Sequence, residues 1–389
     1  MKQGFSIDIK QDVINDLISK LVATRWTNEI NNEKWETGTN KTYLKKLCKY
    51  WENGFDWKTQ ESYLNTFNHF KTTIDDSRIH FIYQKGEGST SIPLLLTHGY
   101  PDGFTRFLKL IPLLTAADEN GFSFDVVVPS IPGYGFSEIP KEKGMDTKKI
   151  AGLFADLMVK ELGYEKFVAH GGDWGGSITE KIALYNSGLL MGIHLTDVPF
   201  AHAMVPLENP SKAEEKFLKK TQMWVQTDGA YSSIQSTKPQ SLAYGLNDSP
   251  AGLAAWIVEK FYAWSDNDGD LENAFTKDEL LINLTIYWAT QTINSSMRLY
   301  YEEIQTIMQA LYNPLVKLNP FDKTGSKTEI PTAFALFPKD ISQPPKEYAE
   351  RFFNVQRWTE MNSGGHFAAL EQPALLAGDI RQFITDLNA

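Results

Sequence analysis

Short apolar runs alternate with amphipathic stretches between residues 93 and 200. Residues 105–114, 148–162 and 177–184 have the spacing of helices. The runs between them suit strands that are covered on both faces, and they comprise 93–97, 124–129, 167–169 and 191–195. Strands that alternate with helices predict a mostly parallel, doubly wound sheet. Such sheets bind ligands beyond the carboxyl ends of their strands.

Further strands are expected on both sides of this segment. Residues 79–83 alternate in a way that predicts a half-buried strand at an edge of the sheet. Near the other end of the chain, 332–337 and 356–361 predict two more strands, and 374–387 predicts a closing helix.

Two regions lack this alternation. Residues 1–77 are mostly helical in pattern and rich in aromatic side chains, which would not stay exposed, so we expect an arm that packs on the rest of the chain. Residues 201–325 read as helices without a strand and predict a lid inserted between two strands. The chain therefore divides into an arm (1–77), a first core part (78–200), a lid (201–325) and a second core part (326–389).

Composition narrows the function classes. The chain has 389 residues and a net charge of −10, which argues against nucleic acid as a partner. Cys48 is the only cysteine and the seven histidines are scattered, so we expect no disulfide and no metal site. No signal peptide precedes the arm and no apolar run reaches the roughly 18 residues of a membrane span. We expect a cytoplasmic protein, and the oligomeric state stays open, with a homodimer as one option.

The strand at 167–169 breaks into the sequence Gly171-Gly172-Asp173-Trp174-Gly175-Gly176, which a helical stretch follows. Gly-x-Asp-x-Gly at a strand-to-helix bend has the form of a hydrolase nucleophile elbow, with Asp where Ser is commoner. Glycines flank the centre because a Cβ would clash in so tight a bend. The Asp173 carboxylate would then project at the carboxyl end of a strand, beside a helix N-terminus that favours negative charge.

Two residues further along the chain complete a candidate triad. His366 lies in Ser-Gly-Gly-His-Phe after the last predicted strand, where such a hydrolase carries its base. Asp340 follows the preceding strand and could orient the imidazole, with Asp197 as the rival acid. The turn His98-Gly-Tyr100-Pro could aim a backbone N–H inward, which with the N–H of Trp174 would form an oxyanion hole.

These motifs together resemble epoxide hydrolases of the α/β-hydrolase fold, and the microsomal type is the nearest in pattern. Gly-Gly-Asp-Trp-Gly-Gly, His-Gly-Tyr-Pro and Gly-Gly-His-Phe carry the likeness in the core. It extends to the arm at 51–57 and 64–67 and to the lid at 229–239, 246–253 and 298–302. Members in animals carry an N-terminal membrane anchor, whereas this chain starts at the arm.

The resemblance implies site roles that the residues alone do not. Two lid tyrosines would hydrogen-bond the epoxide oxygen. Tyr231 matches the first, and Tyr300 matches the second, with Tyr301 as the alternative. Asp173 would form an ester with the substrate, and water activated by His366 and Asp340 would hydrolyse it without a cofactor or metal. Trp174, Tyr100 and Phe367 would contact the substrate, which the apolar lid suggests is an apolar or aromatic epoxide.

Two rival functions stay open. A haloalkane or haloacid dehalogenase uses the same Asp nucleophile but must bind halide. One such pattern wants Arg after the nucleophile, where Trp174 stands, and another wants Asn at the position of Tyr100. A binding protein on a hydrolase scaffold usually lacks a triad member or a lid group, and this chain has the full set.

Overall fold

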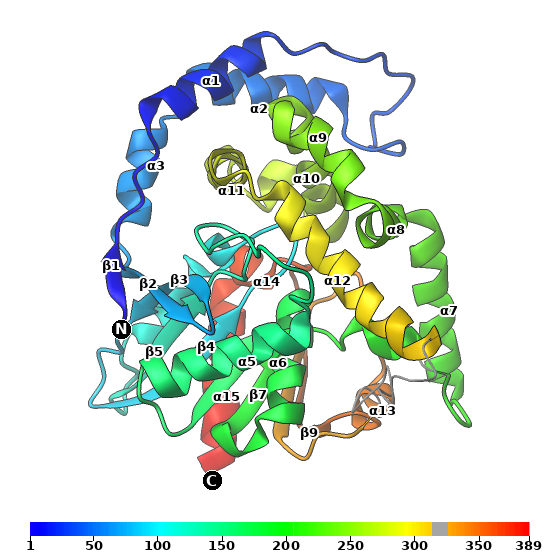
Figure 1. Ribbon diagram of the computed structural model, residues 1–389. Helices are drawn as coiled ribbons and strands as arrows, with labels where there is room; N and C mark the ends of the chain where they lie inside the picture. Colours follow the sequence, from blue (N-terminus) through cyan, green and yellow to red (C-terminus); the bar gives the residue numbers. More distant parts are fainter. Residues whose placement is uncertain (205, 313–325, 389) are drawn as a thin grey trace.

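A nine-stranded sheet forms the centre of the computed structural model, which describes residues 1–204, 206–312 and 326–388 (Figure 1). Its strand order is β1-β2-β3-β5-β4-β6-β7-β8-β9. The strands are β1 (Gln3–Phe5), β2 (His69–Ile74), β3 (Ser77–Gln84), β4 (Thr90–Thr97), β5 (Phe122–Pro129), β6 (Phe167–Gly171), β7 (Leu190–Leu195), β8 (Pro331–Leu336) and β9 (Asn354–Glu360). In this order, each neighbouring pair from β5 through β4, β6, β7 and β8 to β9 is parallel. The pairs β1–β2, β2–β3 and β3–β5 are antiparallel. The predicted mostly parallel sheet is confirmed.

The prediction of an edge strand over residues 79–83 is wrong. This segment is the middle of β3, which pairs with β2 on one side and β5 on the other, and all five residues are buried. The edge lies further out because β1 and β2, which come from the segment expected to be an arm, extend the sheet by two strands. Residues 1–77 are thus helical in the middle and extended near both ends.

Helices cover both faces of the sheet, as the doubly wound pattern requires. The core helices are α4 (Leu110–Thr115), α5 (Thr147–Asp156), α6 (Trp174–Tyr185), α13 (Lys346–Glu350), α14 (Ala368–Glu371) and α15 (Pro373–Asn388). In Figure 1, α5 and α6 lie in front of the sheet and α15 lies behind it. Leu94 and Leu96 of β4 pack with α4 and α15, whereas Leu95 packs with α5 and α6, because alternate strand residues face opposite sides.

Most predicted core elements lie within a few residues of the observed ones, and residues 105–114 differ most. They divide into a 3₁₀ turn, Phe104–Phe107, and α4, which begins at Leu110. Pro112 lacks an N–H and is tolerated only in the first turn of an α-helix. The α-helix can therefore start no more than a turn before it.

A helical insertion follows β7 and lies over the carboxyl ends of the strands (Figure 1). It contains α7 (Lys212–Thr227), α8 (Ala230–Thr237), α9 (Pro239–Asp248), α10 (Pro250–Trp264), α11 (Lys277–Thr290) and α12 (Ile293–Tyr312). No strand interrupts the described part of this region. The last predicted lid residues, 313–325, lie outside the described residues, as does residue 205.

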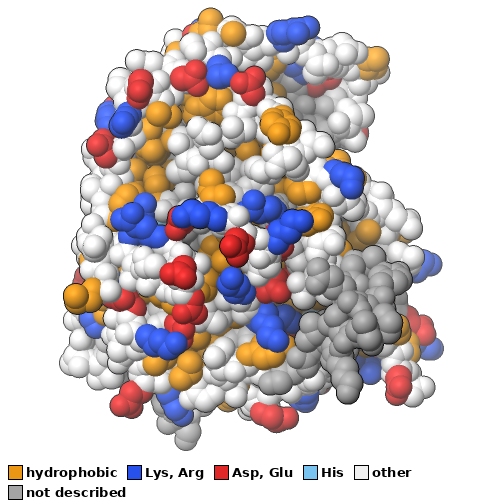
Figure 2. All heavy atoms as spheres, viewed as in Figure 1, with side chains coloured by type: hydrophobic (Ala, Val, Ile, Leu, Met, Phe, Trp, Pro, Cys, Tyr) orange, Lys and Arg blue, Asp and Glu red, His pale blue; other side chains and the backbone are white. Residues whose placement is uncertain are grey.

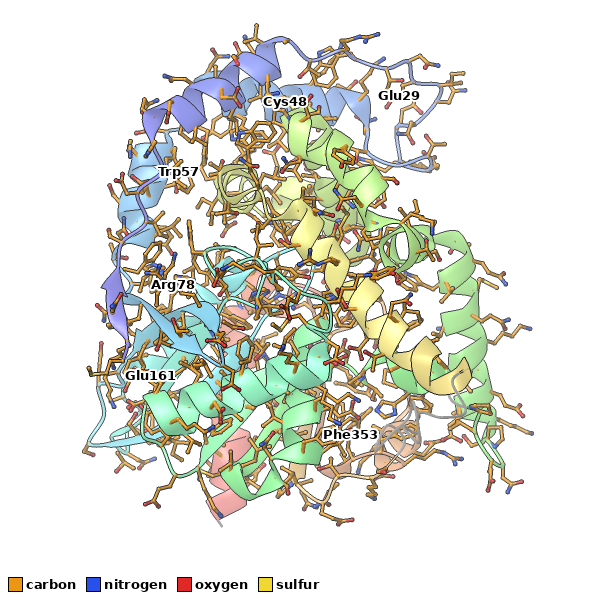
Figure 3. All side chains as sticks on the ribbon, in the orientation of Figure 1. Glu29, Cys48, Trp57, Arg78, Glu161 and Phe353 are labelled. Atoms are coloured by element: carbon orange, nitrogen blue, oxygen red, sulfur yellow. The ribbon has the colours of Figure 1, made fainter. Side chains whose placement is uncertain are left out.

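The arm contains the helices α1 (Gln11–Val22), α2 (Lys41–Asn53) and α3 (Trp57–Leu64). Helices α1 and α2 contact each other, and all three contact helices of the insertion. Cys48 and Trp57, labelled in Figure 3, are buried on these helices. The indole N–H of Trp51 on α2 donates to Thr285 Oγ1 on α11 at 3.0 Å, and the Tyr50 hydroxyl donates to Asp278 at 2.8 Å. The arm thereby fixes the position of α11.

The surface carries charges of both signs. On the face in Figure 2, blue and red side chains are intermixed, with hydrophobic side chains between them. No helix among the described residues is long and apolar enough to cross a bilayer.

Trp51→Ala should destabilise the protein because the indole is only 2% exposed and joins the arm to α11. We expect a loss of about 3–5 kcal/mol of unfolding free energy, as for large aromatic side chains deleted from cores. Denaturant unfolding would measure it. Trp26, which is 38% exposed, is the matched control, and Trp26→Ala should change stability by less than about 0.5 kcal/mol. Equal effects would show that Trp51 does not hold the arm.

Candidate active site

Asp173 occupies the bend between β6 and α6. Its φ of 56° and ψ of −131° put a non-glycine residue in strained backbone. Two glycines make the bend possible. A Cβ on Gly171 would lie 2.2 Å from the carbonyl oxygen of Gly175, and a Cβ on Gly175 would lie 1.9 Å from that of Thr97. Strand β6 and helix α6 therefore approach each other closely, and the chain forms the sharp strand-to-helix bend that the sequence predicts.

The loop after β4 brings a backbone donor to the Asp173 carboxylate. The N–H of Tyr100 donates to Oδ1 at 2.8 Å, and the N–H of Trp174 is a second donor. Gly99 permits this approach, since a Cβ there would lie 2.2 Å from Oδ1. Both N–H groups predicted for an oxyanion hole thus meet at this carboxylate.

Helices of the insertion hold this loop from above. Asn283 on α11 donates to the carbonyl oxygen of Pro101 at 2.9 Å, and the hydroxyl of Tyr287 donates to that of Asp102 at 3.0 Å. The indole of Trp256 on α10 donates to the hydroxyl of Tyr100 at 2.9 Å. The position of the Tyr100 N–H therefore depends on side chains that are more than 150 residues away in the sequence.

His366 lies between two carboxylates. Its Nδ1 is 2.8 Å from Asp340 Oδ1, and its Nε2 is 3.5 Å from Asp173 Oδ2. Burial opposes a charge on the imidazole, but Asp340 and Asp173 outweigh it and raise the pKa of His366 to about 10. Nε2 faces the Asp173 carboxylate and has no other partner among the described residues. The ring is thus anchored by Asp340 at Nδ1 and directs Nε2 toward the elbow, the arrangement that a general base needs.

Asp173 is ionised although its side chain is only 12% exposed. Burial alone would raise the pKa of this carboxyl group, but the hydrogen bond and charge of His366 and the charge of Arg106 lower it. A carboxylate in this state is available as a nucleophile.

Arg106 belongs to a buried ion pair that the sequence reading did not identify. Its Nε pairs with Asp102, and its Nη1 lies 3.5 Å from the carbonyl oxygen of His366. The guanidinium also lies over the ring of Phe367, 5.4 Å from the centroid. The only sequence signal is an Asp and an Arg four residues apart directly after the turn at 98–101, which is weak because such pairs are usually exposed.

Asp197, the rival acid, lies at the site but not on the histidine. Its Oδ2 accepts the N–H of Asp173 at 3.1 Å, while Asp340 occupies Nδ1 of His366. Burial and the nearby charge of Asp340 raise the pKa of Asp197 to about 7. Asp197 therefore stabilises the backbone of the bend by a hydrogen bond, and it does not orient the imidazole of His366.

Tyr231 on α8 and Tyr300 on α12 face each other above the bend, and each is only 6% exposed. Their ring centroids are 6.0 Å apart. The Tyr300 ring packs edge-on against Trp174 at 4.7 Å and against Tyr100 at 5.5 Å, so it adjoins both donors of the oxyanion site. Tyr301 is only partly buried. Of the two neighbours, Tyr300 is the one that lies next to the nucleophile elbow.

Phe367 is fully buried and stacks on Phe261 with centroids 4.1 Å apart. This packing supports the loop that carries His366. Its predicted contact with substrate stays a prediction. The described residues contain no cluster of three or more His, Cys, Asp or Glu side chains that could hold a metal ion.

Comparisons with known proteins agree with this geometry. A family model described as "Epoxide hydrolase N terminus" matches residues 2–107, and one described as "alpha/beta hydrolase fold" matches residues 92–373. "Putative epoxide hydrolase" of Stigmatella aurantiaca is 38% identical over 99% of this chain and 85% of its own length. "Epoxide hydrolase 1" of Sus scrofa is 37% identical over 98% of this chain and 88% of its own.

Solved structures extend the similarity to three dimensions. The juvenile hormone epoxide hydrolase from the silkworm Bombyx mori superposes with a TM-score of 0.85 at 28% identity, covering 100% of this chain and 94% of that one. The Aspergillus niger epoxide hydrolase gives a TM-score of 0.82 at 25% identity, covering 100% and 97%.

Asp197→Asn should stabilise the protein above neutral pH. Since burial and Asp340 raise the pKa of Asp197 to about 7, the folded state binds its proton more tightly than the unfolded state, and stability falls as pH rises from about 4 to 7. Asn cannot ionise, so we expect a gain of roughly 2–4 kcal/mol at pH 8 that shrinks toward pH 4. Melting temperatures across this range would test it. Glu33→Gln, at an exposed position, is the control, and a pH-independent gain would contradict the assignment.

Proposed function

The chain belongs to the epoxide hydrolase family of α/β-hydrolases, and from this membership we propose that it opens an epoxide to a vicinal diol through an ester on Asp173. One observation carries the proposal. A largely buried, ionised carboxylate accepts backbone hydrogen bonds from Tyr100 and Trp174, has an imidazole nitrogen 3.5 Å from its Oδ2, and lies below two buried phenols. The set suits attack on carbon, protonation of the departing oxygen and subsequent ester hydrolysis.

Ester formation begins at Oδ2 of Asp173, since Oδ1 is engaged by the N–H of Tyr100. Oδ2 attacks a ring carbon of the epoxide, and the bond from that carbon to oxygen breaks. The departing oxygen takes a proton from one of the phenols, Tyr231 or Tyr300. Phenols suit this task because they stay protonated at neutral pH, and general acid catalysis of this kind accelerates reactions about 10²–10⁴-fold.

Ester hydrolysis is the second step. His366 takes a proton from water through Nε2, and the hydroxide attacks Cγ of Asp173. Negative charge develops on Oδ1, where the N–H of Tyr100 stabilises it, and the N–H of Trp174 is the second donor to this carboxyl group. The bond to the substrate oxygen breaks, that oxygen takes the proton that the new carboxyl group gives up, and the diol leaves while Asp173 regains its charge.

Esterification also prepares the base for its task. In the free enzyme, the charges of Asp340 and Asp173 keep His366 protonated at neutral pH. The ester on Asp173 is uncharged, so the attraction that this residue exerts on the imidazolium is lost. The pKa of His366 falls in the ester, its proton returns to the phenolate through solvent, and the neutral imidazole is free to accept a proton from water.

The chain's division into parts supports the same function. We propose that the insertion at 201–325 acts as a lid, because its described helices carry Tyr231 and Tyr300 to the carboxyl ends of the strands. The arm at 1–77 would hold that lid through α11. Aromatic side chains around the phenols, including Trp174, Tyr100 and Trp264, favour an apolar or aromatic epoxide. A cytoplasmic location and the oligomeric state stay predictions from the sequence.

His366→Gln should stop the reaction at the ester, because the second step then lacks its base. With styrene oxide, intact-protein mass spectrometry should find an adduct of substrate mass, and peptide mapping should assign it to Asp173. Diol formation should fall by at least about 10³-fold. Asp173→Ala is the matched control and should form neither adduct nor diol. Turnover by that variant, or release of halide from a haloalkane by the unchanged protein, would count against an epoxide hydrolase with this nucleophile.

Tyr300→Phe should slow ester formation far more than ester hydrolysis, since the two phenols act only in the step that opens the epoxide. We expect a loss of about 10²-fold or more in the first step. Stopped-flow fluorescence of single turnovers would separate the two rates. Tyr301→Phe changes the adjacent residue in the same way and should have little effect. If Tyr301→Phe slowed ester formation and Tyr300→Phe did not, the assignment would be shifted by one residue.

A further inference from the structure

Helix α10 presents three side chains to the site along one stripe. Trp256, Lys260 and Trp264 are four residues apart and therefore lie on one face of the helix. Trp256 donates to the hydroxyl of Tyr100, and the indole of Trp264 packs edge-on against His366, with centroids 5.2 Å apart. Trp256 and Trp264 thus each contact a residue that the proposed ester chemistry uses. The central one, Lys260, is a buried lysine.

Lys260 lies against the ring of Tyr231. Its Nζ is 4.7 Å from the centroid of that ring and 5.6 Å from that of Trp264, and the side chain is only 6% exposed. Its ion-pair partner is Glu259 Oε2 at 2.5 Å. An ammonium over an aromatic face is attracted by the ring electrons, and the attraction is larger when water is excluded. A phenolate ring would attract it more strongly still, because the phenolate carries a full charge.

The second phenol has no such neighbour. Among the described residues, no lysine or arginine lies over the ring of Tyr300, which packs against Trp174, Tyr100 and Tyr231. Tyr300 instead hydrogen-bonds Tyr231. The two phenols therefore differ: one adjoins a cation, and the other is a hydrogen-bond donor to the first.

Tyr231 would be a poor acid without help. Burial raises the pKa of its hydroxyl, and Asp173, Tyr100 and Glu259 raise it further, while the hydrogen bond from Tyr300 opposes them. The charged or titratable groups around it are Asp173 at the bend, Tyr100 in the loop after β4, Tyr300 on α12, and Glu259 and Lys260 on α10. Of these, Lys260 is the only cation.

We propose that Lys260 is a positioning residue that makes Tyr231 the phenol whose proton is transferred, while Tyr300 donates a hydrogen bond to the resulting phenolate. This inference rests on the function proposed above. As Oδ2 of Asp173 bonds to the substrate carbon and the carbon–oxygen bond breaks, the O–H bond of Tyr231 breaks and its proton joins the departing oxygen. The negative charge then lies between the ammonium of Lys260 at the ring face and the hydroxyl of Tyr300.

Lys260→Met removes the cation and keeps most of the side-chain volume. We expect ester formation with styrene oxide to slow about 10- to 30-fold, the size of a buried cation–π contact, with ester hydrolysis nearly unchanged. Lys260→Arg should restore most of the rate. Lys20→Met is the matched control, because Lys20 lies over the ring of Trp288 on α11 rather than over a reacting group.

A double-mutant cycle distinguishes this role from a merely structural one. In a Tyr231→Phe background there is no proton to transfer, so Lys260→Met should cause no further loss in ester formation. In a Tyr300→Phe background the full loss should persist. Equal losses in both backgrounds, or equal slowing of both chemical steps, would overturn the proposal.

The unpaired Glu259 in Lys260→Met needs its own control. Glu259→Gln/Lys260→Met removes both charges and also serves if the single variant folds poorly. The double variant should stay slow if the missing cation is the cause, and recovery to the unchanged rate would overturn the proposal. If the unchanged protein formed no ester on Asp173, the proposed function would fail. If the ester formed equally fast with Lys260→Met, only this inference would fail.

Discussion

A carboxylate that must stay charged while it is largely withdrawn from water is the constraint on which this structure depends. Removing such a group from water is costly unless hydrogen bonds and opposite charges replace the solvent. Asp173 receives backbone donors from Tyr100 and Trp174 and the positive charges of His366 and Arg106. The bend, the loop after β4 and the loop that carries His366 all have to meet at this side chain. The glycines of the bend are there because the meeting leaves no room for a Cβ.

The same negative charge has a second effect, on the histidine. While Asp173 is ionised, it holds His366 in the protonated state, and the proposed ester would remove that hold. The order of the two chemical steps then follows from electrostatics and needs no movement of the backbone. The buried pair of Asp102 and Arg106 adjoins the histidine loop, because Nη1 of Arg106 donates to the carbonyl oxygen of His366.

The sequence predicted the alternating strands and helices of the parallel core and the motif at the bend because both are local patterns. It favoured Asp340 as the acid but left Asp197 as a rival, since each follows a strand at the same edge of the sheet, and only the fold shows that Asp340 contacts Nδ1 of His366. Adjacent residues on a helix point about 100° apart, so only one of Tyr300 and Tyr301 can face the elbow. The packing of α12 shows that it is Tyr300, whose ring contacts Trp174. Lys260 and Arg106 escaped notice because charged side chains on helices are usually exposed, and nothing in their immediate sequence marks them as buried.

Helix α11 forms hydrogen bonds in two directions. Its Thr285 accepts from Trp51 of the arm, whereas its Asn283 and Tyr287 donate to the loop that carries the Tyr100 N–H. The arm and the hydrogen bond on Oδ1 are therefore connected through this one helix. Sequence drift in the arm is consequently constrained by turnover as well as by folding, and an arm transplanted from a distant relative would have to match this helix, not merely cover it.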